Sequence, residues 1–177
     1  LEFRRVLFRS KIVEIAPGHG GWGTWALNNR PDATLQGFDI SPSSMAIANL
    51  VAGAGGVGDR ANYTLRNALD LGAMPKASAD AVICSFLIEH LETPEKLVEV
   101  IAHPLKPGAR GYLAGAITAA QVDHIFEFRR ESELVTMCEK YGLRVLETLS
   151  VNPKRTLPRA KFIPRSMGLI LQRQDLP

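Results

Sequence analysis

The sequence predicts an α/β fold in which a mostly parallel sheet is covered by helices on both faces. Short apolar segments alternate with segments of helical pattern along the 177 residues. Parallel neighbouring strands need a crossover connection, usually a helix, and this alternation supplies one after each of the first two strands. A glycine-rich turn follows the first apolar segment, and glycines let a ligand approach the backbone closely. These observations indicate a doubly wound sheet that binds its ligand at the carboxyl ends of the strands.

The first half of the chain predicts three strands and two helices. Arg30 and Pro31 end the first helix, because proline cannot continue a helix and restricts the residue before it. Ser41 and Pro42 predict the start of the second helix, since serine caps a helix and proline fits its first position. The strands are expected at about 11–16, 34–38 and 62–66, and the helices at about 21–29 and from 42 into the glycines of 53–56.

The second half predicts four more strands and two more helices. Thr93 and Pro94 repeat the pattern of a cap followed by a proline, and Gly142 is placed to end the last helix. Residues 105–108 predict a turn before the fifth strand. The strands are expected at about 79–86, 111–116, 143–151 and 166–172, and the helices at about 94–103 and 131–141.

Composition is that of an ordinary soluble globular protein, with 46% hydrophobic and 22% charged residues. No apolar run approaches the roughly 20 residues that span a bilayer. Residues 1–10 supply +2 of the net charge of +3, so a large nucleic-acid footprint is not expected. Cys84 and Cys138 fall in a predicted buried strand and a predicted helix. They do not form a disulfide framework, and we expect reduced thiols and a cytoplasmic location.

Residues 1–10, with the sequence LEFRRVLFRS, differ in character from the rest of the chain. They have no initiator Met and no apolar core of signal-peptide length. The segment 7–10 resembles a translated sequencing-adapter end, although a native, basic, amphipathic lead-in is the alternative. We expect a non-native lead-in at 1–10, a natural upstream region that is missing, and a single domain at 11–177.

The principal motif lies around the glycine-rich turn. Gly18-x-Gly20-x-x-Gly23 fits the dinucleotide fingerprint, which is a weak signal alone and leaves a nicotinamide-dependent oxidoreductase open. Asp39 lies 19 residues past Gly20, at the end of the second strand, where an acid can bind both hydroxyls of a ribose. Glu14, however, lies inside the end of the first strand, where dinucleotide-binding folds usually carry apolar residues.

Glu14-x-Ala16-x-Gly18-x-Gly20 resembles motif I of the class I S-adenosylmethionine-dependent methyltransferases, with Ala16 in place of the usual first glycine. Residues 37–41 resemble the acidic second motif of this family, and 105–113 is similar to the turn before its fifth strand. The resemblance covers about residues 11–172. It implies a Rossmann-like, seven-stranded sheet whose last strand runs antiparallel. Prolines argue against a packed helix in the last connection, at positions Pro153, Pro158 and Pro164.

The resemblance also implies a site for S-adenosylmethionine, which we carry over residue by residue. Glu14 would organise the loop, or alternatively pair with a surface lysine. Asp39 would bind the ribose, or alternatively cap the following helix. The remaining expected contacts are Ala16, Gly18, His19 and Gly20 around the methionine part, Ile40 and Met45 near the adenine, Asn67 and Ala68 at the adenine amino group, and Ser85 and Phe86 facing the sulfonium or the acceptor. Asn67 has an ordinary turn role as its alternative.

Methyl transfer from a sulfonium depends mainly on positioning the acceptor, and a general base helps only where the acceptor must lose a proton. His90 and His124 are the candidates that face the substrate, with site-lining or structural roles as the alternative. Asp123 need not orient His124, because adjacent residues in a strand point oppositely. No catalytic residue is assigned.

Other chemistries lack their motifs in this sequence. The cysteines and histidines show no zinc-type ligand spacing, so no metal is predicted. There is no Gly-x-Ser-x-Gly elbow and no Walker A lysine. The basic residues Lys154, Arg155, Arg159, Lys161 and Arg165 are interpreted as solvated loop charges.

The sequence therefore predicts a methyltransferase that uses S-adenosylmethionine and acts on oxygen or nitrogen of a small-molecule acceptor. Neither nucleic acid nor membrane is an expected partner, and the oligomeric state is left open. The alternatives are an NAD-dependent oxidoreductase and a truncated cofactor-binding domain with little activity.

Overall fold

The computed structural model describes residues 10–67, 69–70, 74–119, 121–151 and 164–175, and shows seven strands and four α-helices there. A single 3-10 turn, Ile88–His90, follows the fourth strand. In chain order the elements are β1 Lys11–Ile15, α1 Gly21–Asn29, β2 Thr34–Asp39, α2 Pro42–Ala54, β3 Ala61–Leu65, β4 Ala79–Ser85, α3 Pro94–Ala102, β5 Leu105–Ile117, α4 Glu131–Lys140, β6 Leu143–Val151 and β7 Arg165–Arg173. None of the helices in this part of the chain has the length and apolar character needed to cross a bilayer.

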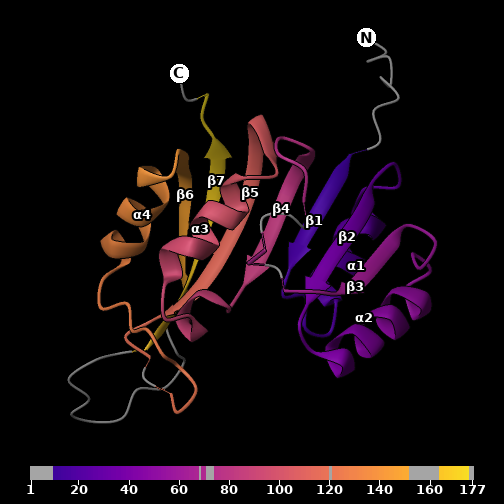
Figure 1. Cartoon of the computed structure of the whole chain (residues 1–177), viewed down its shortest axis with the longest axis horizontal. Helices are drawn as coiled ribbons and strands as arrows, with labels where there is room; N and C mark the ends of the chain where they lie inside the picture. Colours follow the sequence, from indigo (N-terminus) through magenta and orange to yellow (C-terminus); the bar gives the residue numbers. More distant parts are fainter. Residues whose placement is uncertain (1–9, 68, 71–73, 120, 152–163, 176–177) are drawn as a thin grey trace.

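The strands form one sheet in the order β3-β2-β1-β4-β5-β7-β6 (Figure 1). Strands β1 to β5 pair in parallel, whereas β7 runs antiparallel to both β5 and β6. The reversed last strand confirms the fold class predicted from the sequence. The oxidoreductase alternative needs a parallel last strand, and the antiparallel β7 does not meet this requirement.

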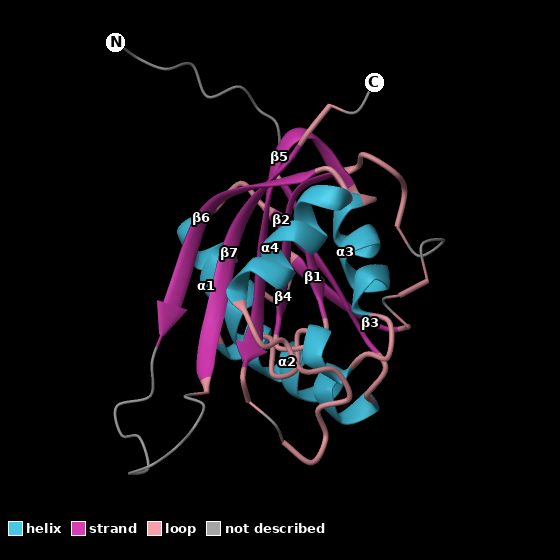
Figure 2. Cartoon of the chain, turned by 90° about the vertical axis from the view of Figure 1, so that its left-hand side faces the viewer, coloured by secondary structure: helices cyan, strands magenta, loops and turns pink. Residues whose placement is uncertain are grey.

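Two apolar cores lie on opposite faces of the sheet, because neighbouring side chains of a strand point to opposite faces. Ile12 packs with α1 and α2 in the smaller core, and Val13 packs with α3 and α4 in the larger one. Figure 2 shows α3 and α4 together on one side of the strands. The helices on both faces complete the doubly wound arrangement.

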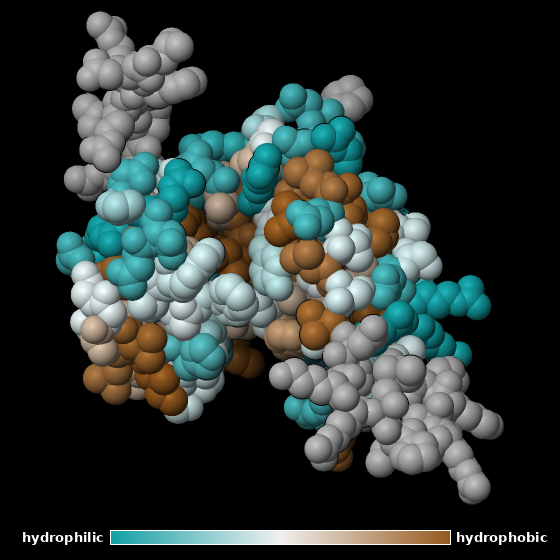
Figure 3. Space-filling model, turned by 180° about the vertical axis from the view of Figure 1, so that it is seen from behind, coloured by the Kyte–Doolittle hydropathy of each residue, from teal (hydrophilic) through white to brown (hydrophobic). Residues whose placement is uncertain are grey.

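One part of the sheet is open on the α1 side. Among the described residues no helix covers this face of β6 and β7, and Leu149 and Val151 are 44% and 65% exposed. Figure 3, which views the molecule from behind, shows apolar surface on this half as well as around α2. Near this face the Trp22 ring lies 6.0 Å from that of Tyr112, between ring centroids.

Most of the predicted helix ends are confirmed by their capping contacts. The Ser41 side chain accepts a hydrogen bond from the Ser44 N–H at 3.2 Å, and Pro42 is the first residue of α2. Gly142 follows α4 with φ +73°, and its N–H donates to the Glu139 carbonyl. Thr93 precedes α3 as predicted, but its side chain makes no capping bond.

The predicted turn at 105–108 is wrong in one respect, because β5 already begins at Leu105. Leu105 pairs with Ala79, and the next pairing joins Arg110 to Ala81, so β5 carries extra residues in this stretch. Gly108, with φ +75°, lies in this irregular segment. The turn chemistry was recognised correctly, but the strand accommodates it as a bulge.

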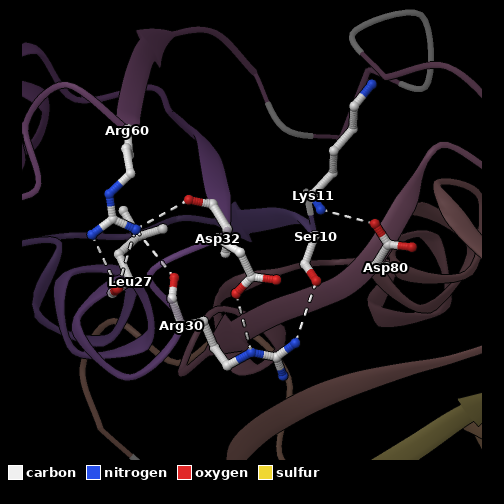
Figure 4. Close-up of polar contacts among 8 residues, drawn as sticks. Ser10, Lys11, Leu27, Arg30, Asp32, Arg60 and Asp80 are labelled. Carbon is white, nitrogen blue, oxygen red and sulfur yellow. Dashed lines mark hydrogen bonds and ion pairs between the residues drawn. The ribbon is translucent and has the colours of Figure 1, made fainter. Parts of the chain in front are cut away.

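Polar contacts tie together the amino-terminal end of the parallel strands (Figure 4). The Arg60 guanidinium donates to the carbonyls of Leu27, Arg30 and Ala33 at 3.1–3.2 Å. The Lys11 N–H donates to the Asp80 carboxylate at 2.8 Å. These contacts fix the connection from α1 to β2 and the start of β1 against β4. The loops that line the pockets lie at the other end of the strands, after β1 and β4.

Candidate functional site

The buried carboxylate of Glu14 holds the loop between β1 and α1. Glu14 is 3% exposed, its Oε1 accepts from the Gly23 N–H at 3.2 Å, and its Oε2 accepts from the Tyr63 hydroxyl at 3.4 Å. Burial raises the pKa of Glu14 to about 7, against the lowering effect of the Gly23 and Tyr63 hydrogen bonds. These contacts support the interpretation that Glu14 organises the loop, and its partners are not lysines.

The loop backbone takes the left-handed conformation at three positions. Ala16, Gly18 and Gly20 have φ values of +50°, +55° and +70°. Ala16 therefore adopts a conformation that glycine occupies without a Cβ penalty. A Cβ built on Gly18 would meet no atom within 4 Å, whereas one on Gly20 would lie 2.8 Å from the Ala48 Cβ. Gly18 thus borders open space, and Gly20 allows α1 and α2 to pack closely.

A pocket of about 290 Å³ opens beside this loop, between β1 and β4. It is lined by Ser85 and Phe86 from the end of β4 and by Trp22 from α1. The Ser85 Oγ is buried without a hydrogen-bond partner among the described residues. Six of the residues expected at the cofactor line this pocket: Glu14, Ala16, Gly18, His19, Ser85 and Phe86. Trp22 was not predicted, and its only signal was an aromatic residue in the first turn after the glycines.

Asp39 joins the loop to the start of α2. Its Oδ2 accepts from the Gly18 N–H at 3.3 Å, and its Oδ1 accepts from the Ser41 N–H at 2.9 Å. The carboxylate is partly buried next to the predicted cofactor loop, and it also makes a contact with the N-cap residue of α2.

The described residues that were expected around the adenine do not line the first pocket. Ile40 is 73% exposed, whereas Met45 is 6% exposed within the core under α2. The burial of Met45 does not support a contact with adenine. The Asn67 Oδ1 accepts from the Leu69 N–H at 3.0 Å, which is the ordinary turn role. Ala68 lies outside the described residues.

A second pocket, of about 470 Å³, adjoins the first through Phe86. Phe86 has φ +54°, which is an outlier for a bulky residue, and its N–H donates to the Ala114 carbonyl at 2.8 Å. Phe86 therefore stands in a strained conformation between the two pockets, as residues at functional sites often do.

The structure brings His90 and His124 together in this second pocket, with ring centroids 5.1 Å apart. The His124 Nδ1 lies 2.5 Å from the Ala119 carbonyl, and the His90 Nδ1 lies 2.9 Å from the Asp123 carbonyl. Asp123 thus contacts His90 and not His124, in agreement with the expectation that Asp123 need not orient His124.

Two further residues of the second pocket were missed or misread in the sequence. Glu89 is 1% exposed, and the available signal was its position directly before His90 in the turn after β4. Arg165 lines the pocket and lies 3.3 Å from the Glu131 carboxylate, so it is not merely a solvated loop charge. The other basic residues of that run lie outside the described residues.

Both cysteines are buried in the larger core. Burial raises the pKa of the Cys138 thiol to about 12 and that of Cys84 further, so both thiols stay protonated at neutral pH. Both are free, as the sequence analysis expected.

The fold and the loop define a class: a doubly wound α/β protein with a pocket beside a glycine-rich loop, at the carboxyl ends of β1 and β4. A family profile described as "Methyltransferase domain" matches residues 13–110, which is more than half of the chain. The chain belongs to this methyltransferase family, of the class I type that uses S-adenosylmethionine.

Individual relatives agree with this membership. The chain is 30% identical over 105 residues to the ubiquinone biosynthesis O-methyltransferase of Xylella fastidiosa (strain 9a5c). That match covers 59% of this chain and 41% of the Xylella protein, so the chain spans less than half of that relative.

Solved structures show the same fold at low identity. Geranyl diphosphate C-methyltransferase from Streptomyces coelicolor A3(2), in complex with Mg²⁺, geranyl diphosphate and S-adenosyl-L-homocysteine, aligns with a TM-score of 0.76 and 13% identity. The alignment covers 93% of this chain and 71% of that one. The [4+2]-cyclase SpnF aligns with a TM-score of 0.77 and 13% identity over 94% and 75% of the two chains. One fold thus carries a transferase and a cyclase, so the function has to be argued from the site.

Proposed function

We propose that this chain binds S-adenosylmethionine beside the β1–α1 loop and transfers its methyl group to oxygen or nitrogen of a small molecule in the adjoining pocket. The observation that carries the proposal is the first pocket, in which the residues matching motif I meet Ser85 and Phe86 from the end of β4. The name of the Xylella relative favours oxygen as the methylated atom.

The residues of the first pocket fit the cofactor. Open space at Gly18 leaves room for a ligand against the backbone, and the unpartnered Ser85 Oγ can donate or accept a hydrogen bond. Asp39 lies beside Gly18, where a carboxylate can accept from both ribose hydroxyls. The cofactor supplies an activated methyl group, and the chain's part is to bind, orient and exclude water.

The second pocket is suited to the acceptor. Phe86 borders both pockets, so a molecule in the second pocket lies next to one in the first. His90 and His124 provide imidazole nitrogens on the lining of this pocket, and such a nitrogen can take a proton from an acceptor hydroxyl or amine. Arg165 adds a cation on the same lining.

The site also weighs against the two alternatives. An oxidoreductase of the nicotinamide type would have apolar packing at Glu14, whereas this carboxylate is hydrogen-bonded inside the loop. A domain that only binds cofactor would have no use for a second pocket that adjoins the first. A cytoplasmic location, which we also propose, is supported by the two free, buried thiols.

Titration calorimetry with S-adenosylhomocysteine and, separately, with NAD tests this function. We expect S-adenosylhomocysteine to bind and NAD not to bind. Asp39→Ala should weaken S-adenosylhomocysteine binding by roughly 1.5–3 kcal/mol, the range for hydrogen bonds to a charged group. Asp32→Ala is the matched control, since Asp32 lies at an exposed turn and pairs only loosely with Arg30 at 3.8 Å. Binding of NAD alone would refute the proposal, and an unchanged affinity in Asp39→Ala would remove Asp39 from the site.

A further inference from the structure

Three side chains of metal-ligand type meet in the second pocket. One ligating atom each of Glu89, His90 and His124 lies within 4.8 Å of the other two. Glu89 and His90 belong to the 3-10 turn after β4, and His124 comes from the segment after β5. The sequence shows no regular ligand spacing here, because the two histidines lie 34 positions apart and only the fold brings them together.

The hydrogen bonds of the two histidines leave one nitrogen of each ring available. In both rings Nδ1 faces a backbone carbonyl, of Ala119 for His124 and of Asp123 for His90. A carbonyl can only accept, so Nδ1 carries the proton, and Nε2 of the neutral ring keeps its lone pair. A ligating histidine in a metal site shows the same pattern, in which the second ring nitrogen donates to a carbonyl or carboxylate.

Glu89 provides the second, independent observation. Its side chain is 1% exposed, and its Oε2 is buried with no hydrogen-bond partner among the described residues. A buried carboxylate oxygen without a partner is costly, because it has lost its hydration and gained nothing in exchange. A cation between Glu89 and the two imidazoles would satisfy this oxygen.

We propose that Glu89, His90 and His124 form a binding site for one divalent metal ion of the Zn²⁺ type. Two imidazoles and one carboxylate are a known ligand set for catalytic zinc and for other divalent transition metals. Bond lengths of about 2.0–2.2 Å place ligand atoms roughly 3–4 Å apart around such an ion, so small side-chain rotations suffice to close the group.

The site deepens the proposed function, and this part of the inference rests on that function. The three ligands lie on the lining of the acceptor pocket, so the remaining coordination positions face the space where the acceptor would bind. A divalent ion there would hold a hydroxyl oxygen of the acceptor and lower its pKa. The acceptor class is then a molecule with a hydroxyl group, and the pocket selects oxygen over nitrogen.

Metal binding can be measured on the chain alone, without cofactor or acceptor. Protein without a polyhistidine tag is stripped with EDTA, dialysed, and titrated with Zn²⁺ by calorimetry, with Co²⁺ absorption as a second readout of imidazole coordination. We expect one ion per chain, and at least about a tenfold loss of affinity in Glu89→Gln and in His124→Ala. His103→Gln is the matched control, because His103 also contacts a backbone carbonyl, that of Met74, but lies outside the group.

The outcomes separate the metal site from the proposed function. Thermal unfolding in EDTA checks that each variant is folded, and if Glu89→Gln does not fold, His124→Ala carries the test. No Zn²⁺ binding, or equal binding in all variants, would overturn the metal site, and S-adenosylhomocysteine binding would still stand as a separate result. Zn²⁺ binding that is lost in the variants supports the site even where S-adenosylhomocysteine does not bind.

Discussion

Two buried glutamates sit at the two halves of the site, and their surroundings differ. Glu14 and Glu89 are the buried charged side chains of the described residues, with exposures of 3% and 1%. Both oxygens of Glu14 accept hydrogen bonds, from Gly23 and from Tyr63. Glu89 instead leaves Oε2 without a partner from the chain. Burial alone therefore does not define a role, because the chain satisfies both oxygens of the Glu14 carboxylate and leaves one oxygen of the Glu89 carboxylate without a hydrogen bond.

This difference assigns the two acids to different functions. Glu14 holds the β1–α1 loop through its hydrogen bond with the Gly23 N–H, and under the proposed function it would be a positioning residue. Glu89 lies among ligand-type side chains, where a cation would complete its coordination. Substitutions at the two positions should therefore change stability in opposite directions.

The largest effect is expected for Glu14→Ala, which removes the partner of the Gly23 N–H and of the Tyr63 hydroxyl and leaves a void. We expect the free energy of unfolding to fall by about 3–4 kcal/mol, measured by urea denaturation at pH 6. Glu14→Gln is the control, because its amide can accept from Gly23 and donate to Tyr63. An equal fall of the unfolding free energy in Glu14→Ala and Glu14→Gln would show that the lost hydrogen bonds do not cause the destabilisation.

The next effect is the pH dependence of stability that Glu14 introduces. Its pKa is raised from 4.5 to about 7 in the folded chain, so the unfolded chain releases this proton at lower pH. The stabilising contribution is complete below pH 4.5 and is lost as the pH rises through 7. Relative to Glu14→Gln, the wild-type chain should lose about 3 kcal/mol of unfolding free energy between pH 4.5 and 8. If the unfolding free energies of the wild-type chain and of Glu14→Gln changed with pH in the same way, the raised pKa of Glu14 would be contradicted.

A smaller effect of opposite sign is expected for Glu89→Met in EDTA. Methionine has a similar length and removes the unpartnered oxygen, so the unfolding free energy should rise by about 1–2 kcal/mol. The same variant should lose Zn²⁺ binding, which is the trade of function against stability expected at a binding site. A destabilised variant would mean that the Glu89 carboxylate already supports the fold.

The smallest effect concerns Ala16, whose φ of +50° favours glycine. Ala16→Gly relieves this conformation but gives the unfolded chain more freedom, so we expect a stability change below about 1 kcal/mol. Ala77→Gly is the matched control, because Ala77 also has φ +50° but lies away from the loop. Both variants should show similar unfolding free energies, and only Ala16→Gly should change the affinity for S-adenosylhomocysteine.

The sequence grouped the residues that line the first pocket better than those that line the second, for a physical reason. The β1–α1 loop is a local feature, since Glu14 to Gly23 lie within ten consecutive residues and their order carries the signal. The helix starts at Pro42 and Pro94 were likewise predicted from local capping chemistry. The burial of Met45 was missed, because burial on α2 depends on which face packs against the sheet.

The second pocket depends on contacts between distant segments. His90 and His124 were named individually, but their meeting follows from the pairing of β4 with β5 and from the path of the chain after β5. Glu89 showed no sign of burial in the sequence, since it lies in a short turn with no periodic pattern. Grouping these side chains required the three-dimensional structure.

A crystal structure of the chain grown with S-adenosylhomocysteine tests the central claim most directly. The ribose hydroxyls should lie within hydrogen-bond distance of the Asp39 carboxylate, with the amino-acid part of the ligand against the backbone at Gly18. Electron density for the ligand at any other place on the molecule, or a ribose that does not contact Asp39, would contradict the assignment of this loop as the methyl-donor site.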